Sequence, residues 1–192
     1  MADLLDHDPA RDDQLILVDA LDRPLGTATK EEAHRQALLH RALSVVLVRE
    51  GASGCELLLS RRAEGKYHSA GLWANSVCSH PRAGEQTRVA AVRRVPEEIG
   101  CEAQGLVEVG AFCYRAVFPE GLTEFEYDHV FVGTQRGAIV PDPYEVSEVR
   151  WVTPDEVARE LAEHPDRFSA WAPMVLSLAL AWLRDRRTDS GV

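Results

Sequence analysis

Several acidic side chains near the middle of the chain have the types and spacing that suit a divalent cation. Glu97 and Glu98 lie just before Gly100, near the end of a segment whose apolar residues recur at helical spacing. Glu85 and Arg93 lie upstream of them. Carboxylates near the end of such a helix could hold a hard cation such as Mg²⁺ against substrate phosphates. From spacing alone, a solvent-exposed acidic helix face remains the alternative.

A second cluster, NSVCSHP at residues 75–81, combines a thiol with an imidazole. Cys78 could donate or accept a proton if its pKa is tuned, and His80 could bind a metal beside it. A single cysteine and histidine in a loop can equally be incidental, so the pair indicates a site only together with other groups.

Two carboxylates alternate in TEFEYDH, so Glu124 and Glu126 would share one face of a strand. On an exposed face this is ordinary, whereas on an inner face two adjacent carboxylates require a metal or a shared proton. His34 and His40, each alone a plain surface or packing histidine, complete a larger set with His80. Three histidines and two carboxylates would suit an octahedral site for a borderline divalent ion.

Strands and helices must position these residues. Runs rich in β-branched and apolar residues predict strands at 14–20, 43–48, 56–60, 106–118, 124–134 and 148–152. Helical spacing and capping residues predict helices at 86–99, 154–163 and 171–184. Gly100 is expected to end the first helix, and Pro96 to kink it or make its last turn irregular.

The remaining long segment, residues 63–85, is predicted to be a loop, and loops of this length usually carry function. Strands before, between and after helices predict an α/β or α+β sandwich. The 192 residues, 45% of them hydrophobic, suit a single domain. We expect it to span residues 14–187, between a flexible acidic tail at 1–13 and a short polar tail at 188–192.

Composition excludes several classes of function. The net charge of -10, without a long basic run, disfavours nucleic acid and anionic membranes as partners. No segment approaches the roughly 20 apolar residues of a membrane span, and the acidic start does not resemble a signal peptide, so a cytoplasmic protein is expected. The four cysteines are expected to be free thiols, and the protein a monomer or small homo-oligomer.

The segments GLWANSVCSHP, RRAEGKYH, GLTEFEYDHVFV and FSAW resemble, in order, the signature segments of type 1 isopentenyl diphosphate isomerases. The acidic set resembles the Nudix box, in which a glycine, five residues, a glutamate, seven residues, an arginine and Glu-Glu-x-Gly follow one another. Here Ser79 replaces the glycine, and Arg94 stands where the hydrolases carry a glutamate. The resemblance implies a Nudix-like mixed sheet between helices that binds a diphosphate without cutting it.

The resemblance further implies that the chain interconverts isopentenyl and dimethylallyl diphosphate, in isoprenoid precursor biosynthesis. That reaction adds a proton at C4 and removes one from C2 through a carbocation-like species, so it needs proton-transfer groups on opposite faces. By resemblance Cys78 lies on one face and Glu126 on the other, with Tyr114 beside the glutamate. Trp171 offers its π face to the cation, a role compatible with a purely packing tryptophan.

The implied ligands fall into two sets. Mn²⁺, Zn²⁺ or Mg²⁺ would be held by His34, His40, His80, Glu124 and Glu126, where the interval between the first two is one residue shorter than in some members. The small-molecule diphosphate would contact Lys30, Arg62, Lys66 and Arg94, with a second ion, Mg²⁺, bridging it to Glu98. No flavin is implied. Lys30 and Lys66 are the only lysines among 21 cations, and a compact ammonium suits phosphate.

Two other functions compete with the isomerase. A Nudix hydrolase of nucleoside diphosphate compounds would share the fold and the Mg²⁺, but Arg94 and the segment from Cys78 to His80 argue against it. A non-catalytic Nudix-fold module would predict damaged catalytic positions, whereas the candidate acid, base and metal ligands are all present.

Overall fold

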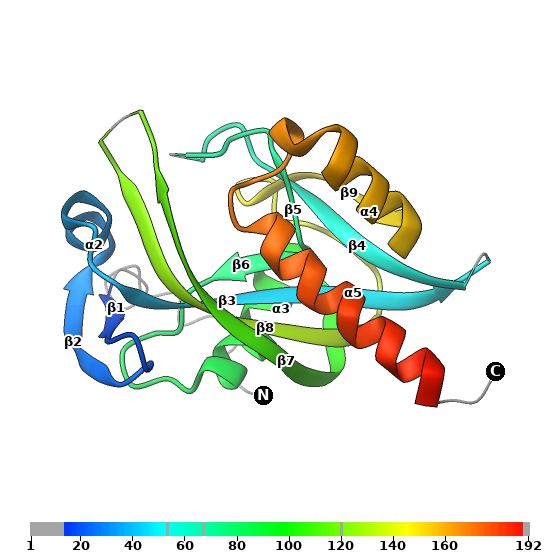
Figure 1. Cartoon of the computed structure of the whole chain (residues 1–192), viewed down its shortest axis with the longest axis horizontal. Helices are drawn as coiled ribbons and strands as arrows, with labels where there is room; N and C mark the ends of the chain where they lie inside the picture. Colours follow the sequence, from blue (N-terminus) through cyan, green and yellow to red (C-terminus); the bar gives the residue numbers. More distant parts are fainter. Residues whose placement is uncertain (1–13, 53, 67, 120, 190–192) are drawn as a thin grey trace.

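The computed structural model describes residues 14–189 except 53, 67 and 120, and shows a mixed sheet with helices on both faces (Figure 1). The predicted tail at 1–13 lies outside the described residues, and residues 188 and 189 of the other tail still belong to the last helix. The strands are β1 Gln14–Val18, β2 Pro24–Thr29, β3 His40–Gly51, β4 Gly54–Arg62, β5 Trp73–Ala74, β6 Val77–Ser79, β7 Glu102–Val117, β8 Thr123–Arg136 and β9 Val146–Val152. The helices are α2 Lys30–Gln36, α3 Thr87–Ile99, α4 Pro154–Glu163, the 3-10 turn Pro165–Arg167 and α5 Ala172–Asp189.

Strand β3 is the centre of the sheet. Strand β8 pairs with it in parallel along 40–48, and β7 forms a long antiparallel hairpin with β8. Along its other edge β3 meets β1 at its start, β6 in its middle and β4 at its end. Residues from distant parts of the chain therefore meet near the first half of β3.

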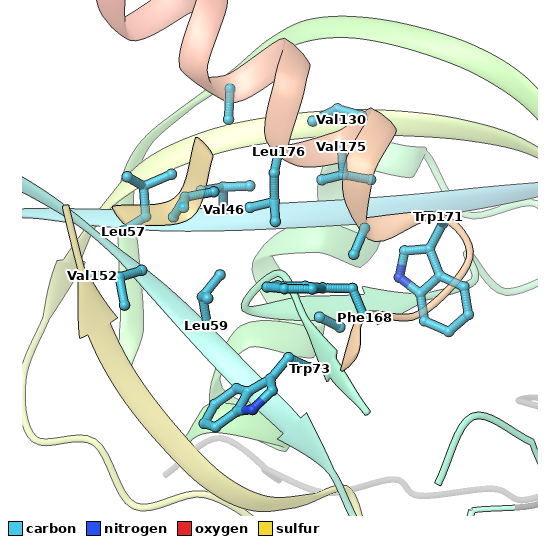
Figure 2. Close-up of a cluster of buried hydrophobic side chains, with 14 of the residues drawn as sticks. Val46, Leu57, Leu59, Trp73, Val130, Val152, Phe168, Trp171, Val175 and Leu176 are labelled. Carbon is cyan, nitrogen blue, oxygen red and sulfur yellow. The ribbon is translucent and has the colours of Figure 1, made fainter. Parts of the chain in front are cut away.

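Alternation along β3 builds two cores. Val46 faces a cluster that includes Trp73 and the α5 residues Val175 and Leu176 (Figure 2). Its neighbour Val45 faces the opposite cluster, which packs against α3. Because successive strand side chains point to opposite faces, one apolar run serves both layers. The predicted α+β sandwich is confirmed.

Helix α3 ends as its glycine predicts. Gly100 has a φ of 73°, in the left-handed region, and its N–H donates to the Pro96 carbonyl at 3.1 Å. The helix remains continuous through Pro96 to Ile99. A Cβ atom at Gly100 would clash with the Val140 carbonyl oxygen, so this position needs glycine for space as well as for φ.

Two elements near the N-terminus were not predicted. Strand β2 pairs with β1, and α2 is a seven-residue helix whose Thr29 hydroxyl accepts from the Glu32 N–H while the Glu32 carboxylate accepts from the Thr29 N–H. Strands β5 and β6 likewise lie inside the segment predicted as a loop. Each of these elements is short, so it lacks the repeated pattern that sequence periodicity detects.

Within the described residues, no helix is long and apolar enough to cross a membrane.

Candidate active site

A pocket gathers most of the residues singled out in the sequence. Those that line it are Lys30, Arg62, Lys66, Cys78, His80, Arg94, Tyr114, Glu124, Glu126 and Trp171. His34, His40 and Glu98 are buried but are not among its lining residues. The pocket thus joins the predicted proton-transfer groups to the predicted diphosphate ligands.

Four of the predicted metal ligands converge. The candidate ligand atoms of His34, His40, His80 and Glu126 all lie within 4.8 Å of one another. His34 lies in α2 and His40 begins β3. His80 directly follows β6, and Glu126 lies in β8. The short α2 thus carries one ligand, and the interval between His34 and His40 accommodates the turn that reverses the chain from α2 into β3.

The donor set fits a cation. His40 Nδ1 lies 2.8 Å from the Leu38 carbonyl oxygen, which can only accept, so in the neutral ring Nδ1 carries the proton. His40 Nε2 then presents a lone pair 3.5 Å from Glu126 Oε1. Two electron-pair donors that face each other in a buried site suit an ion between them, and a second nitrogen bonded to a carbonyl is typical of metal-binding histidines.

Burial keeps the imidazoles of His34 and His80 neutral. Burial lowers the pKa of His34 to about 3, with help from the neighbouring His40 and His80. Burial also lowers the pKa of His80 to about 4, although its hydrogen bond with Glu126 opposes the shift. For Glu126 burial acts to raise the pKa, but its contacts with His40 and His80 outweigh it and hold the pKa well below its usual value. Neutral histidines and an ionised carboxylate are the forms that bind a metal.

Glu124 lies beside this group rather than in it. The Tyr114 hydroxyl lies 2.6 Å from Glu126 Oε2 and 2.9 Å from Glu124 Oε2, so it can donate to either carboxylate. The other oxygen of Glu124 is 2.8 Å from His68 Nε2. Burial, followed by the charges of the two glutamates, raises the pKa of Tyr114, which therefore keeps its proton. The predicted contact of Tyr114 with Glu126 is present in the structure.

Cys78 is held as a thiol. Its Sγ donates to Asn75 Oδ1 at 3.1 Å and accepts from Trp171 Nε1 at 2.9 Å. Burial raises the pKa of the thiol, and the charges of Asp128 and Glu98 add to the shift. Trp171 also packs in the hydrophobic cluster around α5 (Figure 2), so it serves as a core residue and as a wall of the pocket.

Cationic side chains occupy another part of the pocket. Lys66 pairs with Glu145, whose other oxygen is 3.6 Å from Arg94. Arg94 in turn contacts the buried Glu98 at 2.9 Å. Burial lowers the pKa of Lys30, and the charge of Lys66 lowers it further. Several cations held this close together, beside the carboxylates of Glu98 and Glu145, form a site that suits a more highly charged anion.

The acidic residues of the Nudix-like box are tied to arginines. Arg93 donates to Glu85 at 2.8 Å and 2.9 Å and to Glu97 at 3.0 Å. Arg94 donates to Glu97 at 2.7 Å. The cation that replaces a hydrolase glutamate therefore pairs with Glu97, a carboxylate that could otherwise bind Mg²⁺.

Sequence reasoning missed four polar residues of the pocket, namely Ser44, His68, Asp128 and Glu145. Asp128 continues the alternation of Glu124 and Glu126, so the period of two could have found it. It is buried and accepts from the Ser44 hydroxyl at 2.8 Å. His68 lies inside the quoted RRAEGKYH segment, whereas no pattern marks Glu145.

Comparisons with known proteins agree with this geometry. A model of the NUDIX domain matches residues 38–172, more than half of the chain. The isopentenyl-diphosphate Delta-isomerase of Photobacterium profundum is 44% identical over 172 residues, which are 88% of this chain and 95% of the relative. The chain belongs to the isopentenyl-diphosphate Delta-isomerase family of Nudix proteins. The isomerase of Serratia proteamaculans is also 44% identical, over 83% of this chain and 87% of the relative.

Solved structures confirm the fold alone. A protein from Deinococcus radiodurans superposes with a TM-score of 0.67 at 22% identity, over 84% of this chain and 96% of that one. A MutT Nudix hydrolase from Burkholderia pseudomallei superposes with a TM-score of 0.57 at 17% identity, over 73% and 97%. At these identities the hydrolase shares the Nudix architecture with this isomerase-family chain, and its chemistry does not transfer.

Proposed function

We propose that this chain interconverts isopentenyl and dimethylallyl diphosphate, with Cys78 and Glu126 as its two proton-transfer groups. One observation carries the assignment: a protonated thiol and an ionised carboxylate, borne by the separate strands β6 and β8, line the same pocket. The pocket therefore holds a proton donor and a proton acceptor before substrate enters.

The reaction moves a double bond without touching the diphosphate. A proton adds to C4, the C3–C4 double bond becomes a single bond, and positive charge develops on C3. Loss of a proton from C2 then places the double bond between C2 and C3. One of Cys78 and Glu126 gives the first proton, the other takes the second, and Tyr114 can pass a proton to the Glu126 oxygen that lies 2.6 Å away.

The indole of Trp171 supports the charged intermediate. Its ring lines the pocket, and its N–H donates to the Cys78 sulfur. This hydrogen bond fixes the position of the thiol relative to the indole ring. A desolvated cation over a tryptophan face gains about 2 kcal/mol. The buried surroundings exclude water, which would otherwise trap the cation.

We propose that the protein holds two ions. We propose that His34, His40, His80 and Glu126, with Glu124 at their edge, hold Mn²⁺, Zn²⁺ or Mg²⁺, which would orient Glu126 and set its acidity. We also propose that Glu98 binds Mg²⁺ together with the diphosphate, whose oxygens Lys30, Arg62, Lys66 and Arg94 contact.

A product assay tests this function. Purified protein with Mg²⁺ and Mn²⁺ should convert isopentenyl diphosphate to dimethylallyl diphosphate and release no phosphate from nucleoside diphosphate sugars. Phosphate release without isomerisation would show that the Nudix box works as a hydrolase site, and would overturn the proposal.

A further inference from the structure

His68 contacts residues from several parts of the pocket. Its side chain is buried, and its Nε2 lies 2.8 Å from Glu124 Oε1. Its ring stacks on Phe118, with centroids 4.6 Å apart and planes 21° apart, and lies nearly perpendicular to the Trp171 ring, with centroids 6.0 Å apart. Its main-chain carbonyl accepts from the Arg62 guanidinium at 3.2 Å.

The hydrogen bonds define which ring nitrogen donates. A carboxylate oxygen only accepts, so the proton lies on His68 Nε2, and Nδ1 can accept from the Ser69 hydroxyl at 3.3 Å. The second oxygen of Glu124 is already within reach of Tyr114. His68 contacts one oxygen of Glu124, Tyr114 contacts the other, and stacking on Phe118 holds the His68 ring. The Glu124 carboxylate is therefore held in one orientation.

We propose that His68 is a positioning residue that orients Glu124 so that this carboxylate completes the metal site of His34, His40, His80 and Glu126. The inference rests on the proposed function, because it assigns Glu124 to the ion of that site. Metal-binding carboxylates are themselves hydrogen-bonded, and removal of such an outer partner typically costs 10- to 100-fold in metal affinity.

The side chain and the main chain of His68 have separate tasks. His68→Ala removes the donor to Glu124 and the stacked ring, but keeps the carbonyl that holds Arg62. Metal affinity should therefore fall by about 10- to 100-fold, while the affinity for diphosphate should change much less. His68→Gln restores an N–H donor at similar reach, and should recover most of the lost affinity.

The metal affinity is measured by titrating Mn²⁺ into the metal-free full chain without diphosphate. The electron paramagnetic resonance of free Mn²⁺ follows the binding. The affinity for diphosphate is measured by calorimetric titration with inorganic pyrophosphate in the presence of Mg²⁺. His164→Ala, in which an exposed side chain at the end of α4 is removed, is the matched control and should bind both like wild type.

Weaker Mn²⁺ binding in His68→Ala, recovered by His68→Gln, with pyrophosphate binding retained, supports the proposal. Mn²⁺ binding by His68→Ala as tight as wild type, or tighter, overturns it, as does a failure of His68→Gln to recover affinity. These outcomes differ from failure of the proposed function, in which the wild-type chain itself binds Mn²⁺ but forms no dimethylallyl diphosphate.

Discussion

The Tyr114 hydroxyl lies between two carboxylates that have different surroundings. It is 2.6 Å from Glu126, which contacts the histidines, and 2.9 Å from Glu124, which contacts His68. The sequence indicated the pairing of the two glutamates through their alternation, and the resemblance added Tyr114. Neither could show the hydrogen bond from Trp171 to Cys78, because that contact joins residues 93 positions apart.

Tyr114→Phe should lower kcat on the order of 10²-fold, the lower end of what a positioned proton-transfer group supplies. The ring and its packing remain, whereas Glu126 loses the hydroxyl that positions or relays its proton. The KM for isopentenyl diphosphate should change little, because cationic side chains, and not Tyr114, are expected to bind the diphosphate. Steady-state kinetics measure both constants.

Tyr127→Phe is the matched control, since Tyr127 does not line the pocket and its ring lies 5.3 Å from that of His129. Equal losses of kcat in the two variants would mean that Tyr114→Phe acts by disturbing the sheet, and not by removing the hydrogen bond to Glu126.

The buried histidines predict how acid affects the metal-free protein. Unfolded histidines take up protons below pH 6.5, whereas His34 and His80 have folded pKa values of about 3 and 4. Between those limits the unfolded state binds more protons, so both residues make the free energy of unfolding fall as the pH falls. Denaturant unfolding at pH 7 and pH 5 should show the decline, and it should be smaller in His34→Gln.

Imidazole NMR signals provide the direct check. Signals from His34 and His80 that titrate near pH 6.5 in the folded, metal-free protein would contradict this account.

Among the elements, segments rich in apolar residues were predictable, whereas short segments that are polar or contain glycine were not. The β7–β8 hairpin, α3 and α4 follow from apolar alternation, helical spacing and the capping box at Thr153. Strand β2, helix α2 and strand β6 are too short for such patterns, yet they or their adjoining residues carry Lys30, His34, Cys78 and His80. Tertiary pairing with β1 and β3 forms the two strands.

Gly100→Ala should destabilise the protein more than Gly84→Ala. Both glycines have a φ in the left-handed region, 73° and 79°, where alanine costs about 1–2 kcal/mol. A Cβ atom at Gly84 meets open space, whereas one at Gly100 clashes with the backbone of Val140. Thermal or denaturant unfolding of the two variants isolates the clash, and equal losses would show that the loop at Val140 moves aside at no cost.

At the scale of the whole molecule, the metal group joins segments that the sandwich brings together. His34 follows the β1–β2 hairpin, His40 begins the central strand, His80 follows β6, and Glu126 lies on β8 beside His40 in the parallel register. The sequence predicted the fold class and the candidate ligands. It could not supply the register of β3 with β8, which places His40 opposite Glu126.

Metal binding should therefore stabilise the whole domain. An ion that binds only the folded chain adds about 2.7 kcal/mol to the free energy of unfolding at a free concentration 100 times its Kd. Thermal melts with Mn²⁺ and with a chelator should differ accordingly in wild type and in His164→Gln. The difference should shrink sharply in Glu126→Gln, and an unchanged difference there would place the ion elsewhere.

The fate of solvent deuterium tests whether Cys78 and Glu126 transfer the two protons. Wild type, Cys78→Ala and Glu126→Gln are incubated with isopentenyl diphosphate, Mg²⁺ and Mn²⁺ or Zn²⁺ in D₂O, and the products are followed by NMR. Wild type should form dimethylallyl diphosphate with deuterium in the methyl group made from C4, and each variant should be slower by on the order of 10²-fold or more. Conversion without deuterium, or conversion at the wild-type rate in either variant, would contradict the assignment of Cys78 and Glu126 as the proton-transfer pair.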